Sequence, residues 1–344
     1  MKIEFYRAQI SCCFVLFAFV ATAANAAESI FRPSLTEHGQ ADFQGNWTNT
    51  TFTPLERDEE LGTKRTYTLE EAIEVETEKL QEHENKAAPS DPDRGAPEVT
   101  EFVSNDAEFI FLGSHLRAAK VNSEYRTSLV VVPENGRIPF VEDPASTTLQ
   151  DSRRSLGFGD YDGPEIRGVG ERCLSDYGPM PPLLVVPGSS NFKIVQTDDH
   201  VMLYGEPGNE ARIIPFTDKR RSSLDAKWHG DSIARWENNT LVINTTNFHP
   251  QHSDRTFKIS ESFEIEERFR LVARDEIYYR YEVTDPNFYT ESWVVENTLT
   301  RMPENDKLYE YGCHEGNYSL PGILAGARRQ EQDQVEGITE YFDN

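Results

Sequence analysis

Hydrophobic and polar residues alternate along much of the chain after residue 128. The segments "FKIVQTDDHVMLYGE" and "DSIARWENNTLVINTTNF" have a β-branched or aromatic residue at nearly every second position, and a pair of Asp or Asn residues interrupts each segment. This spacing sends alternate side chains to opposite faces of a strand, and Asp or Asn pairs favour tight turns. The pattern therefore predicts consecutive antiparallel strands joined by hairpins.

About ten such strands follow one another, and closing them into a barrel or sandwich removes exposed strand edges. The predicted fold class is mostly β: an antiparallel β-barrel or sandwich with a lipocalin-like meander, over residues 99–344. The segment "LPGILAGARRQEQDQVEG" predicts a C-terminal helix that closes this domain.

Residues 27–98 have a different pattern. "FQGNWTNTTFTPLER" predicts an early strand that ends near Pro54, and an acidic helix is predicted to follow it. Thr68 and Glu71 have the spacing of a capping box at the start of that helix. "PSDPDRGAPE" has the composition of a linker. This N-terminal region therefore predicts a strand, an acidic helix and a linker.

The first 26 residues have the organisation of a secretory signal peptide. Lys2 and Arg7 precede an apolar run, and Ala24-Asn25-Ala26 follows it as a cleavage site. A membrane anchor, the alternative interpretation, needs about 20 apolar residues, and this run is shorter. We expect an exported protein, periplasmic or secreted, with no membrane attachment once residues 1–26 are removed.

The charge of the chain narrows the classes of partner. Its formal net charge is −25, so its surface repels the phosphate backbones of nucleic acids and anionic membranes. The sequence contains no nucleotide-binding loop, haem motif or iron–sulfur spacing. We therefore expect no nucleic-acid partner and no cofactor, and a small-molecule or oligosaccharide-like substrate as the partner.

Two cysteines, Cys173 and Cys313, remain after signal removal. An even pair in an exported protein is most simply a disulfide, because that compartment is oxidising. Cys173 lies in a segment rich in Gly, Pro and Asp, whereas Cys313 belongs to "YGCHEGNY". The predicted disulfide would join these two distant loops. Two buried thiols are the alternative.

Several longer segments carry a resemblance to known sequences. "GDSIARWENNTLVINTTNF" and "YEYGCHEGNYSLPGILAGAR", together with "ERCL" and "TSLVVVPENGRIP", resemble segments shared by a family of exported, largely uncharacterised bacterial β-rich proteins. The shared patterns are GDSxxRWExxTLVxxTTNF and YxCHEGNY. This resemblance implies export and a β-rich fold, and it implies no particular chemistry.

The predicted disulfide defines the first candidate site. It would bring Arg172 near His314 and Glu315. A histidine moves protons at neutral pH, and a neighbouring carboxylate orients it. We expect His314 to act as the general acid or base, Glu315 to orient it, Arg172 to hold an anionic group and Tyr318 to contact the substrate. Alternatively, His314 and Glu315 only form hydrogen bonds within the loop.

The second candidate site is "KWHGDSIARWE". His229 and Asp231 flank a glycine and are candidate catalytic proton carriers. Arg235, four residues after Asp231, shares its strand face and is a candidate substrate-binding residue. Trp228 and Trp236 are candidates to stack on a ring or sugar. Alternatively, Asp231 caps a turn, Arg235 pairs with a carboxylate and both tryptophans belong to the core.

"HPQHSD" contains His249, His252 and Asp254, which are metal-ligand types at close spacing. The segment lies in a proline-containing turn with no helix to fix the ligand geometry, so we expect no metal site.

Aromatic residues alternate in "YYRYEVTDPNFYTESW". We expect Tyr279, Tyr281 and Trp293 on one face and Tyr278 on the other. Inward aromatic residues in a β-barrel line a cavity or fill the core, and the second interpretation is favoured here.

Two functions follow from these patterns. The first is an exported, cofactor-independent acid–base enzyme, a lyase, isomerase or hydrolase, that acts on a small or oligomeric polar organic substrate in a β-barrel cavity. The alternative is a non-catalytic barrel that binds a hydrophobic or aromatic small molecule. A polar cluster open to a cavity favours catalysis, whereas a sealed cluster favours binding or a structural role.

Overall fold

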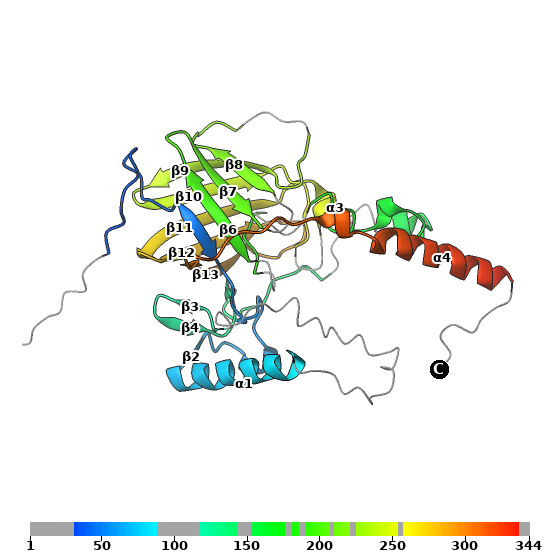
Figure 1. Ribbon diagram of the computed structural model, residues 1–344, viewed down its shortest axis with the longest axis horizontal. Coiled ribbons are helices and arrows are strands. Elements are labelled where there is room, and N and C mark those ends of the chain that lie inside the picture. The colour runs from blue at the N-terminus through cyan, green and yellow to red at the C-terminus, as the bar shows by residue number, and fades with distance from the viewer. Residues whose placement is uncertain are drawn as a thin grey trace, which may run out of the picture. The chain divides into compact units, whose positions relative to one another are not determined.

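The structure is a computed structural model, and it describes residues 31–87, 117–142, 153–175, 181–185, 190–206, 210–220, 225–253 and 257–336 (Figure 1). The elements below belong to one compact unit, Pro33–Asn344. The predicted signal peptide and the predicted linker at residues 89–98 lie outside the described residues.

Nine strands among the described residues form the wall of an antiparallel, nearly closed barrel (Figure 1). They are β1 (Gly45–Thr48), β6 (Asn191–Gln196), β7 (His200–Gly205), β8 (Ala211–Pro215), β9 (Asp231–Glu237), β10 (Thr240–Thr246), β11 (Glu264–Ala273), β12 (Glu276–Thr284) and β13 (Trp293–Arg301). Each strand pairs with the next in this order, except at β8 and β9, and β13 pairs back with β1. The prediction of a mostly β, antiparallel barrel is confirmed.

The wall is weakest between β8 and β9. Among the described residues, a single parallel bridge between Phe216 and Ala234 joins these two strands, and the Thr217 amide donates a hydrogen bond to the Ala234 carbonyl at 3.2 Å. Elsewhere the neighbours share regular ladders, such as the seven paired positions from Thr240–Glu237 to Thr246–Asp231 between β9 and β10. We call the β8–β9 junction the seam.

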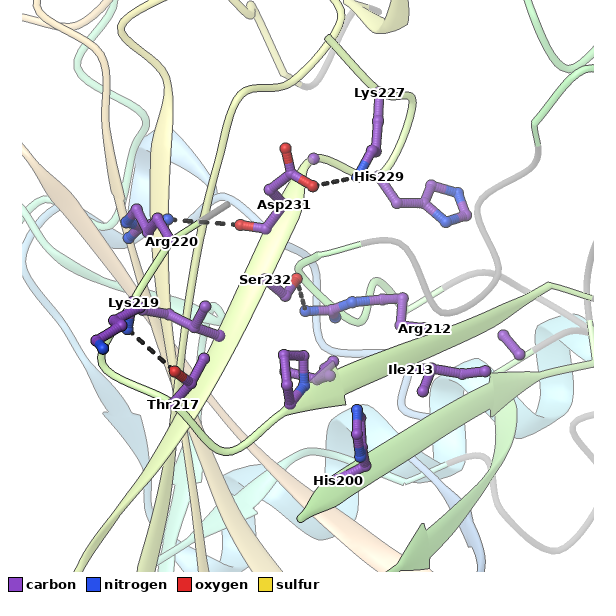
Figure 2. Close-up of a pocket in the computed structure, with 15 residues that line it drawn as sticks. His200, Arg212, Ile213, Thr217, Lys219, Arg220, Lys227, His229, Asp231 and Ser232 are labelled. Atoms are coloured by element: carbon purple, nitrogen blue, oxygen red, sulfur yellow. Dashed lines mark hydrogen bonds and ion pairs between the residues drawn. The ribbon is translucent and has the colours of Figure 1, made fainter. Parts of the chain in front are cut away.

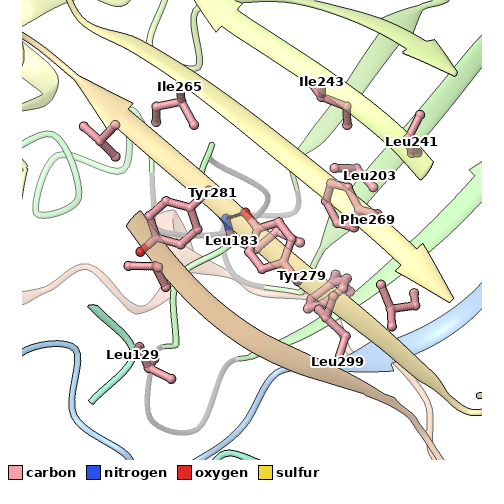
Figure 3. Close-up of a cluster of buried hydrophobic side chains, with 14 of the residues drawn as sticks. Leu129, Leu183, Leu203, Leu241, Ile243, Ile265, Phe269, Tyr279, Tyr281 and Leu299 are labelled. Atoms are coloured by element: carbon pink, nitrogen blue, oxygen red, sulfur yellow. Dashed lines mark hydrogen bonds between the residues drawn. The ribbon is translucent and has the colours of Figure 1, made fainter. Parts of the chain in front are cut away.

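The alternation of side chains along the strands fills the barrel interior with apolar groups (Figure 3). Tyr279, Tyr281 and Trp293 are at most 2 % exposed, as the sequence predicts. Each fully buried large side chain contributes about 1.5–3 kcal/mol of hydrophobic stabilisation. Tyr278 lies on the other face, where burial and the carboxylate of Glu296 raise its pKa to about 12.

The predicted turns are also present. Asn238 and Asn239 form the two-residue connection between β9 and β10, and Asn238 has a φ of 56°. Asn tolerates this left-handed conformation better than most residues. Asp198 and Asp199 lie in the turn between β6 and β7.

A second, three-stranded sheet and the first helix lie outside the barrel wall. The sheet contains β2 (Thr66–Tyr67), β4 (Glu124–Arg126) and β3 (Lys120–Val121), and the helix is α1 (Leu69–Ala87). The predicted capping box is present at the start of α1. The Thr68 amide donates to Glu71 Oε2 at 2.9 Å, and the Glu71 amide donates to Thr68 Oγ1 at 3.2 Å. The acidic helix therefore begins where the sequence predicts.

The C-terminal helix is confirmed as α4 (Ser319–Val335), which follows the short helix α3 (Cys313–Gly316). The described residues also contain three short 3₁₀ helices, Glu59–Leu61, Pro164–Ile166 and Pro250–His252, and a helical segment at residues 153–155.

Two predicted strands are shorter in the structure. The early strand is limited to β1, and the next residue, Asn49, donates from its side-chain amide to the carbonyls of Leu183 and Leu184, both at 3.1 Å. The strand predicted before Asn135-Gly136 is β5 (Val130–Val132), which pairs with β13. The strand predicted after that turn is reduced to an isolated bridge between Phe140 and Tyr289.

Candidate functional site

A hollow of about 550 Å³ lies at the seam (Figure 2). Its wall is formed by β8, the residues that follow β8, the start of β9 and His200 of β7. The charged and polar side chains in this wall are those of His200, Arg212, Thr217, Lys219, Arg220, Lys227, His229, Asp231 and Ser232. The hollow therefore contains two of the predicted catalytic residues, His229 and Asp231.

Gly230 allows the chain to pass close to β10 at the top of the hollow. Its φ is +66°, and a Cβ at this position would lie 2.6 Å from the Thr246 carbonyl oxygen. Because a side chain has no room here, only glycine fits without a shift of backbone. The approach fixes where His229 and Asp231 leave the chain on either side of the glycine.

His229 contacts two polar side chains from distant loops. Its Nε2 lies 2.7 Å from Glu210 Oε2 and 3.0 Å from Ser175 Oγ. The contact with Glu210 is an ion pair when His229 is protonated. The side chain of His229 is 17 % exposed, which keeps it in reach of the hollow.

Ser175 also contacts a second histidine, His252. Ser175 Oγ lies 3.4 Å from His252 Nε2, and His252 Nδ1 lies 2.6 Å from the Trp228 carbonyl oxygen. A carbonyl only accepts hydrogen bonds, so His252 Nδ1 carries the proton and its Nε2 is the acceptor when the ring is neutral. Ser175 can then donate to His252 while its oxygen accepts from His229. Together Ser175, His229, His252 and Glu210 form what we call the two-histidine cluster.

Arg212, which lines the hollow, belongs to a buried ion pair. Arg212 Nη2 lies 2.6 Å from Glu267 Oε2, and the two side chains are 3 % and 0 % exposed. The Tyr279 hydroxyl donates to Glu267 Oε1 at 2.8 Å, and Arg212 Nη2 also donates to Ser232 Oγ at 3.2 Å. Burial and the nearby Glu267 carboxylate raise the pKa of Tyr279 well above its ordinary value, so its hydroxyl stays protonated.

Asp231 is engaged at both carboxylate oxygens. Oδ1 pairs with Lys227, and Oδ2 accepts a hydrogen bond from Asn247 Nδ2 at 2.8 Å. These contacts tie the first residue of β9 to the residues that precede it. Asp231 thus lines the hollow with its charge already balanced by Lys227.

The Cys173–Cys313 disulfide is present, with the two Cα atoms 5.8 Å apart. It places Arg172 beside the "CHEG" helix, and Asn317 Nδ2 reinforces the junction by donating to the Glu171 carbonyl at 2.8 Å. The predicted partners of this junction, His314, Glu315 and Tyr318, are exposed on and after α3. None of these residues or Arg172 is among those that line the hollow. The structure brings the two loops together, and Ser175 of the Cys173 loop contacts His229, but Arg172, His314, Glu315 and Tyr318 lie outside the lining of the hollow.

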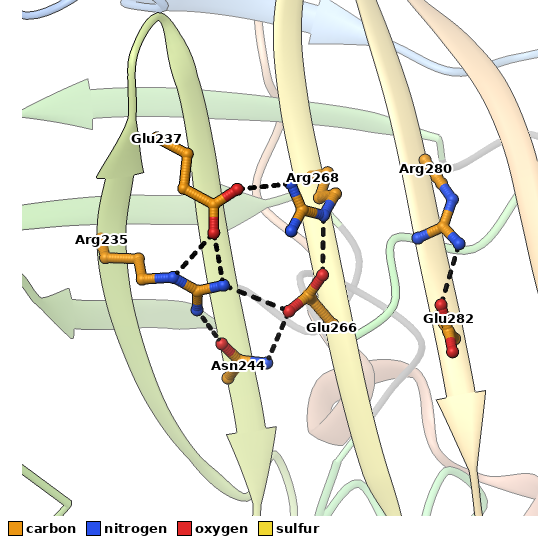
Figure 4. Close-up of polar contacts among 7 residues, drawn as sticks. All are labelled: Arg235, Glu237, Asn244, Glu266, Arg268, Arg280 and Glu282. Atoms are coloured by element: carbon orange, nitrogen blue, oxygen red, sulfur yellow. Dashed lines mark hydrogen bonds and ion pairs between the residues drawn. The ribbon is translucent and has the colours of Figure 1, made fainter. Parts of the chain in front are cut away.

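Arg235 lies on the outer face of the barrel (Figure 4). It pairs with Glu237 at 2.7 Å and Glu266 at 3.3 Å, and Arg268 joins the same network through both carboxylates. Asp231 and Arg235 do share a face, as their spacing predicts, but Arg235 does not line the hollow.

The two candidate tryptophans lie apart. Trp236 stacks in the core between Phe43 and Phe216, with ring centroids 5.9 and 5.8 Å away. Trp228 packs against His249 at 4.5 Å. Neither is among the residues that line the hollow, so their contacts match the core and packing alternative.

The histidines of "HPQHSD" have other contacts. His249 Nδ1 accepts a hydrogen bond from the Gln251 amide at 3.2 Å, and His252 belongs to the two-histidine cluster. Asp254 lies outside the described residues. Within the described part of the chain, no group of three or more His, Cys, Asp or Glu side chains is placed to hold a metal ion.

Sequence reasoning missed Ser175, Glu210, Arg212 and Glu267. A signal existed for the last two, because each is a charged residue at an inward position of an alternating strand, which predicts a buried pair. Ser175 follows Cys173 by two residues, so the predicted disulfide drew attention to this loop but gave no reason to choose the serine. No sequence signal places Glu210 near His229.

Comparisons with models of protein families, with curated proteins and with solved structures found no match. Among the described helices, none has the length and apolar character to cross a membrane.

Proposed function

We propose that this protein is an exported, cofactor-independent acid–base enzyme, a lyase, isomerase or hydrolase, that acts on a small or oligomeric polar organic compound. The observation that carries the proposal is the position of His229. It lines a hollow of about 550 Å³, and the other side of its ring contacts Glu210 and Ser175. Histidine is the residue best suited to moving protons at neutral pH.

The cluster supplies what proton transfer requires. When His229 takes a proton from a substrate, the Glu210 carboxylate at 2.7 Å balances the new positive charge. Ser175 Oγ accepts a hydrogen bond from the His229 ring at 3.0 Å and donates its own hydrogen bond to His252 Nε2 at 3.4 Å, so it orients the His229 ring. The Trp228 carbonyl fixes the tautomer of His252, so the direction of these hydrogen bonds is defined. A base held by an orienting partner is the arrangement that general acid–base catalysis uses.

We place the proton-transfer group at His229 rather than at His314. His314 and Glu315 are exposed on α3 and do not line the hollow, whereas His229 is partly enclosed. A partly enclosed site excludes water from the reacting groups and strengthens their electrostatic effect on a substrate.

Export is supported by the disulfide, because such bonds persist in oxidising compartments. The signal-peptide pattern of residues 1–26 agrees with the same compartment.

The alternative, a barrel that binds a hydrophobic or aromatic molecule, is less well supported. Buried side chains such as Phe269, Tyr279 and Tyr281 occupy the inward face of the wall (Figure 3). The hollow at the seam combines apolar residues of β8 and β9 with a set of charged and polar groups: His200, Arg212, Thr217, Lys219, Arg220, Lys227, His229, Asp231 and Ser232. These polar groups suit a polar substrate.

The test is an activity panel on the purified mature protein. The panel contains carboxylic esters, neutral glycosides and oligosaccharides with uronic acid units, so that hydrolysis and elimination are both detected. For any class turned over, we expect His229→Gln to lower kcat by roughly 100-fold or more. His38→Gln, a histidine change away from the hollow, should leave the rate unchanged. If a folded His229→Gln protein kept full activity while His314→Gln lost activity, the proton-transfer group would be His314 on α3 and the proposal for His229 would be refuted.

A further inference from the structure

Most charged groups around the hollow are balanced by a neighbour of opposite charge. Lys227 pairs with Asp231, and Arg212 pairs with Glu267. His229 faces Glu210, and His200 Nδ1 lies 2.8 Å from Asp199 Oδ1. Each of these charged side chains therefore has an oppositely charged neighbour, and the loop after β8 is the exception.

Two cations in the wall differ from the others. Lys219 and Arg220 line the hollow on the loop that follows β8 (Figure 2), and in the described part of the chain neither forms an ion pair. Arg220 Nη1 donates instead to the neutral Thr246 Oγ1 at 2.6 Å and to the Asp231 carbonyl at 3.4 Å. Among the described residues, no carboxylate therefore lies within ion-pair distance of either side chain.

This local charge stands out against the rest of the molecule. The formal net charge is −25, and acidic side chains are abundant enough to pair with most cations. Two uncompensated cations at a hollow create a local positive potential within an otherwise negative surface, and such a potential concentrates anions. Thr246 holds one Arg220 nitrogen in place, so the other guanidinium donors remain available to a ligand.

We propose that the hollow binds a small organic anion through Lys219 and Arg220, and that the recognised group is a carboxylate or sulfate. Guanidinium and ammonium groups form charge-assisted hydrogen bonds with both groups. This inference deepens the proposed function and rests on it for the role of the anion: an acidic substrate held by Lys219 and Arg220 would share one hollow with His229. Acidic sugars and small organic acids are the substrate classes with this chemistry.

The experiment measures binding without turnover, by calorimetry or NMR titration at low ionic strength. D-glucuronate is the carboxylate probe, inorganic sulfate is the second anion, and D-glucose is the neutral control. The test variant is Lys219→Gln with Arg220→Gln, because glutamine removes the charge and keeps a polar side chain at both positions. The matched control is Lys193→Gln with Arg270→Gln, which removes two exposed positive charges elsewhere on the barrel.

We expect the wild-type protein to bind glucuronate at least roughly tenfold more tightly than glucose, with weaker binding as salt is added. The Lys219/Arg220 variant should lose roughly tenfold or more in affinity, and the control variant should bind as the wild type does. Equal affinities for sulfate and glucuronate would indicate that the hollow recognises the negative charge alone. A higher affinity for glucuronate would indicate further contacts with the sugar ring.

Unchanged affinity in the Lys219/Arg220 variant, equal binding of glucose, or no binding of either anion would overturn the inference. The outcome is separable from that of the proposed function. A protein that binds glucuronate through these two residues but turns over nothing in the activity panel would contradict the enzyme and leave the anion site standing.

Discussion

Replacing Glu267 by Gln removes the negative charge from the interior of the barrel. Glu267 is fully buried, and it receives Arg212 Nη2 at 2.6 Å, Arg212 Nη1 at 3.3 Å and the Tyr279 hydroxyl at 2.8 Å. Glutamine has nearly the same shape, so the change leaves packing intact while Arg212 keeps an uncompensated positive charge in a buried position. Removing one partner of a buried ion pair costs about 3–5 kcal/mol of unfolding free energy.

The control for this change is an ion pair on the outer face. Arg280 and Glu282 lie 2.8 Å apart, but their side chains are 26 % and 39 % exposed (Figure 4). Water and salt screen such pairs, so Glu282→Gln should cost about 0–1 kcal/mol. Urea unfolding followed by tryptophan fluorescence, without reductant, gives both free energies on the same scale.

A double variant separates the loss of the pair from the loss of one partner. Arg212→Met with Glu267→Leu replaces both charges by apolar side chains, and buried pairs replaced in this way often lose little stability. We expect the double variant to recover most of the loss seen in Glu267→Gln. If Glu267→Gln cost no more than Glu282→Gln, water would have to reach Arg212, and the reasoning about a dry barrel interior would be refuted.

Two further predictions concern the disulfide and pH. Cys173→Ser with Cys313→Ser should lower the free energy of unfolding by up to about 5 kcal/mol in the chain-entropy model, because the bond closes a loop with a sequence separation of 140 residues; equal urea midpoints for the oxidised wild type and the variant would contradict this. Burial lowers the pKa of His249 in the folded protein, so as pH falls the histidine becomes protonated first in the unfolded chain. The free energy of unfolding should therefore decrease as pH falls below about 6.5, the ordinary pKa of histidine, until the pH reaches the lower pKa of the folded state. His249→Gln should make the urea midpoint less dependent on pH in that range, and an unchanged pH dependence would show that His249 does not contribute.

The alternation of residues predicted the strands from β6 to β13 because each strand has one apolar face toward the core. The same reasoning placed Tyr279 and Tyr281 inside the barrel, and the Asn238-Asn239 pair at a hairpin. Local signals of this kind work when the structure follows from neighbouring residues, as in the Thr68–Glu71 capping box.

The two-histidine cluster could not be predicted in this way. Ser175 meets His229 across 54 residues and His252 across 77 residues, so the contacts depend on how loops pack at the barrel end. Alternation along a strand also predicts which residues share a face of the sheet, but it does not predict which other groups surround each of them. Asp231 and Arg235 share a face as predicted, yet Asp231 lines the hollow and Arg235 belongs to an outer charge network.

The position of the candidate site follows from the incomplete pairing of two strands. A barrel wall is sealed where neighbouring strands satisfy each other's backbone groups in a continuous ladder. At the seam, the described residues form one bridge, between Phe216 and Ala234, in place of that ladder, and the hollow lies beside it. The connection between the two strands, residues 216–230, carries Lys219 and Arg220 near its start and Lys227 and His229 near its end. The same local break therefore opens the wall and brings both the cations and the proton-transfer group to the opening.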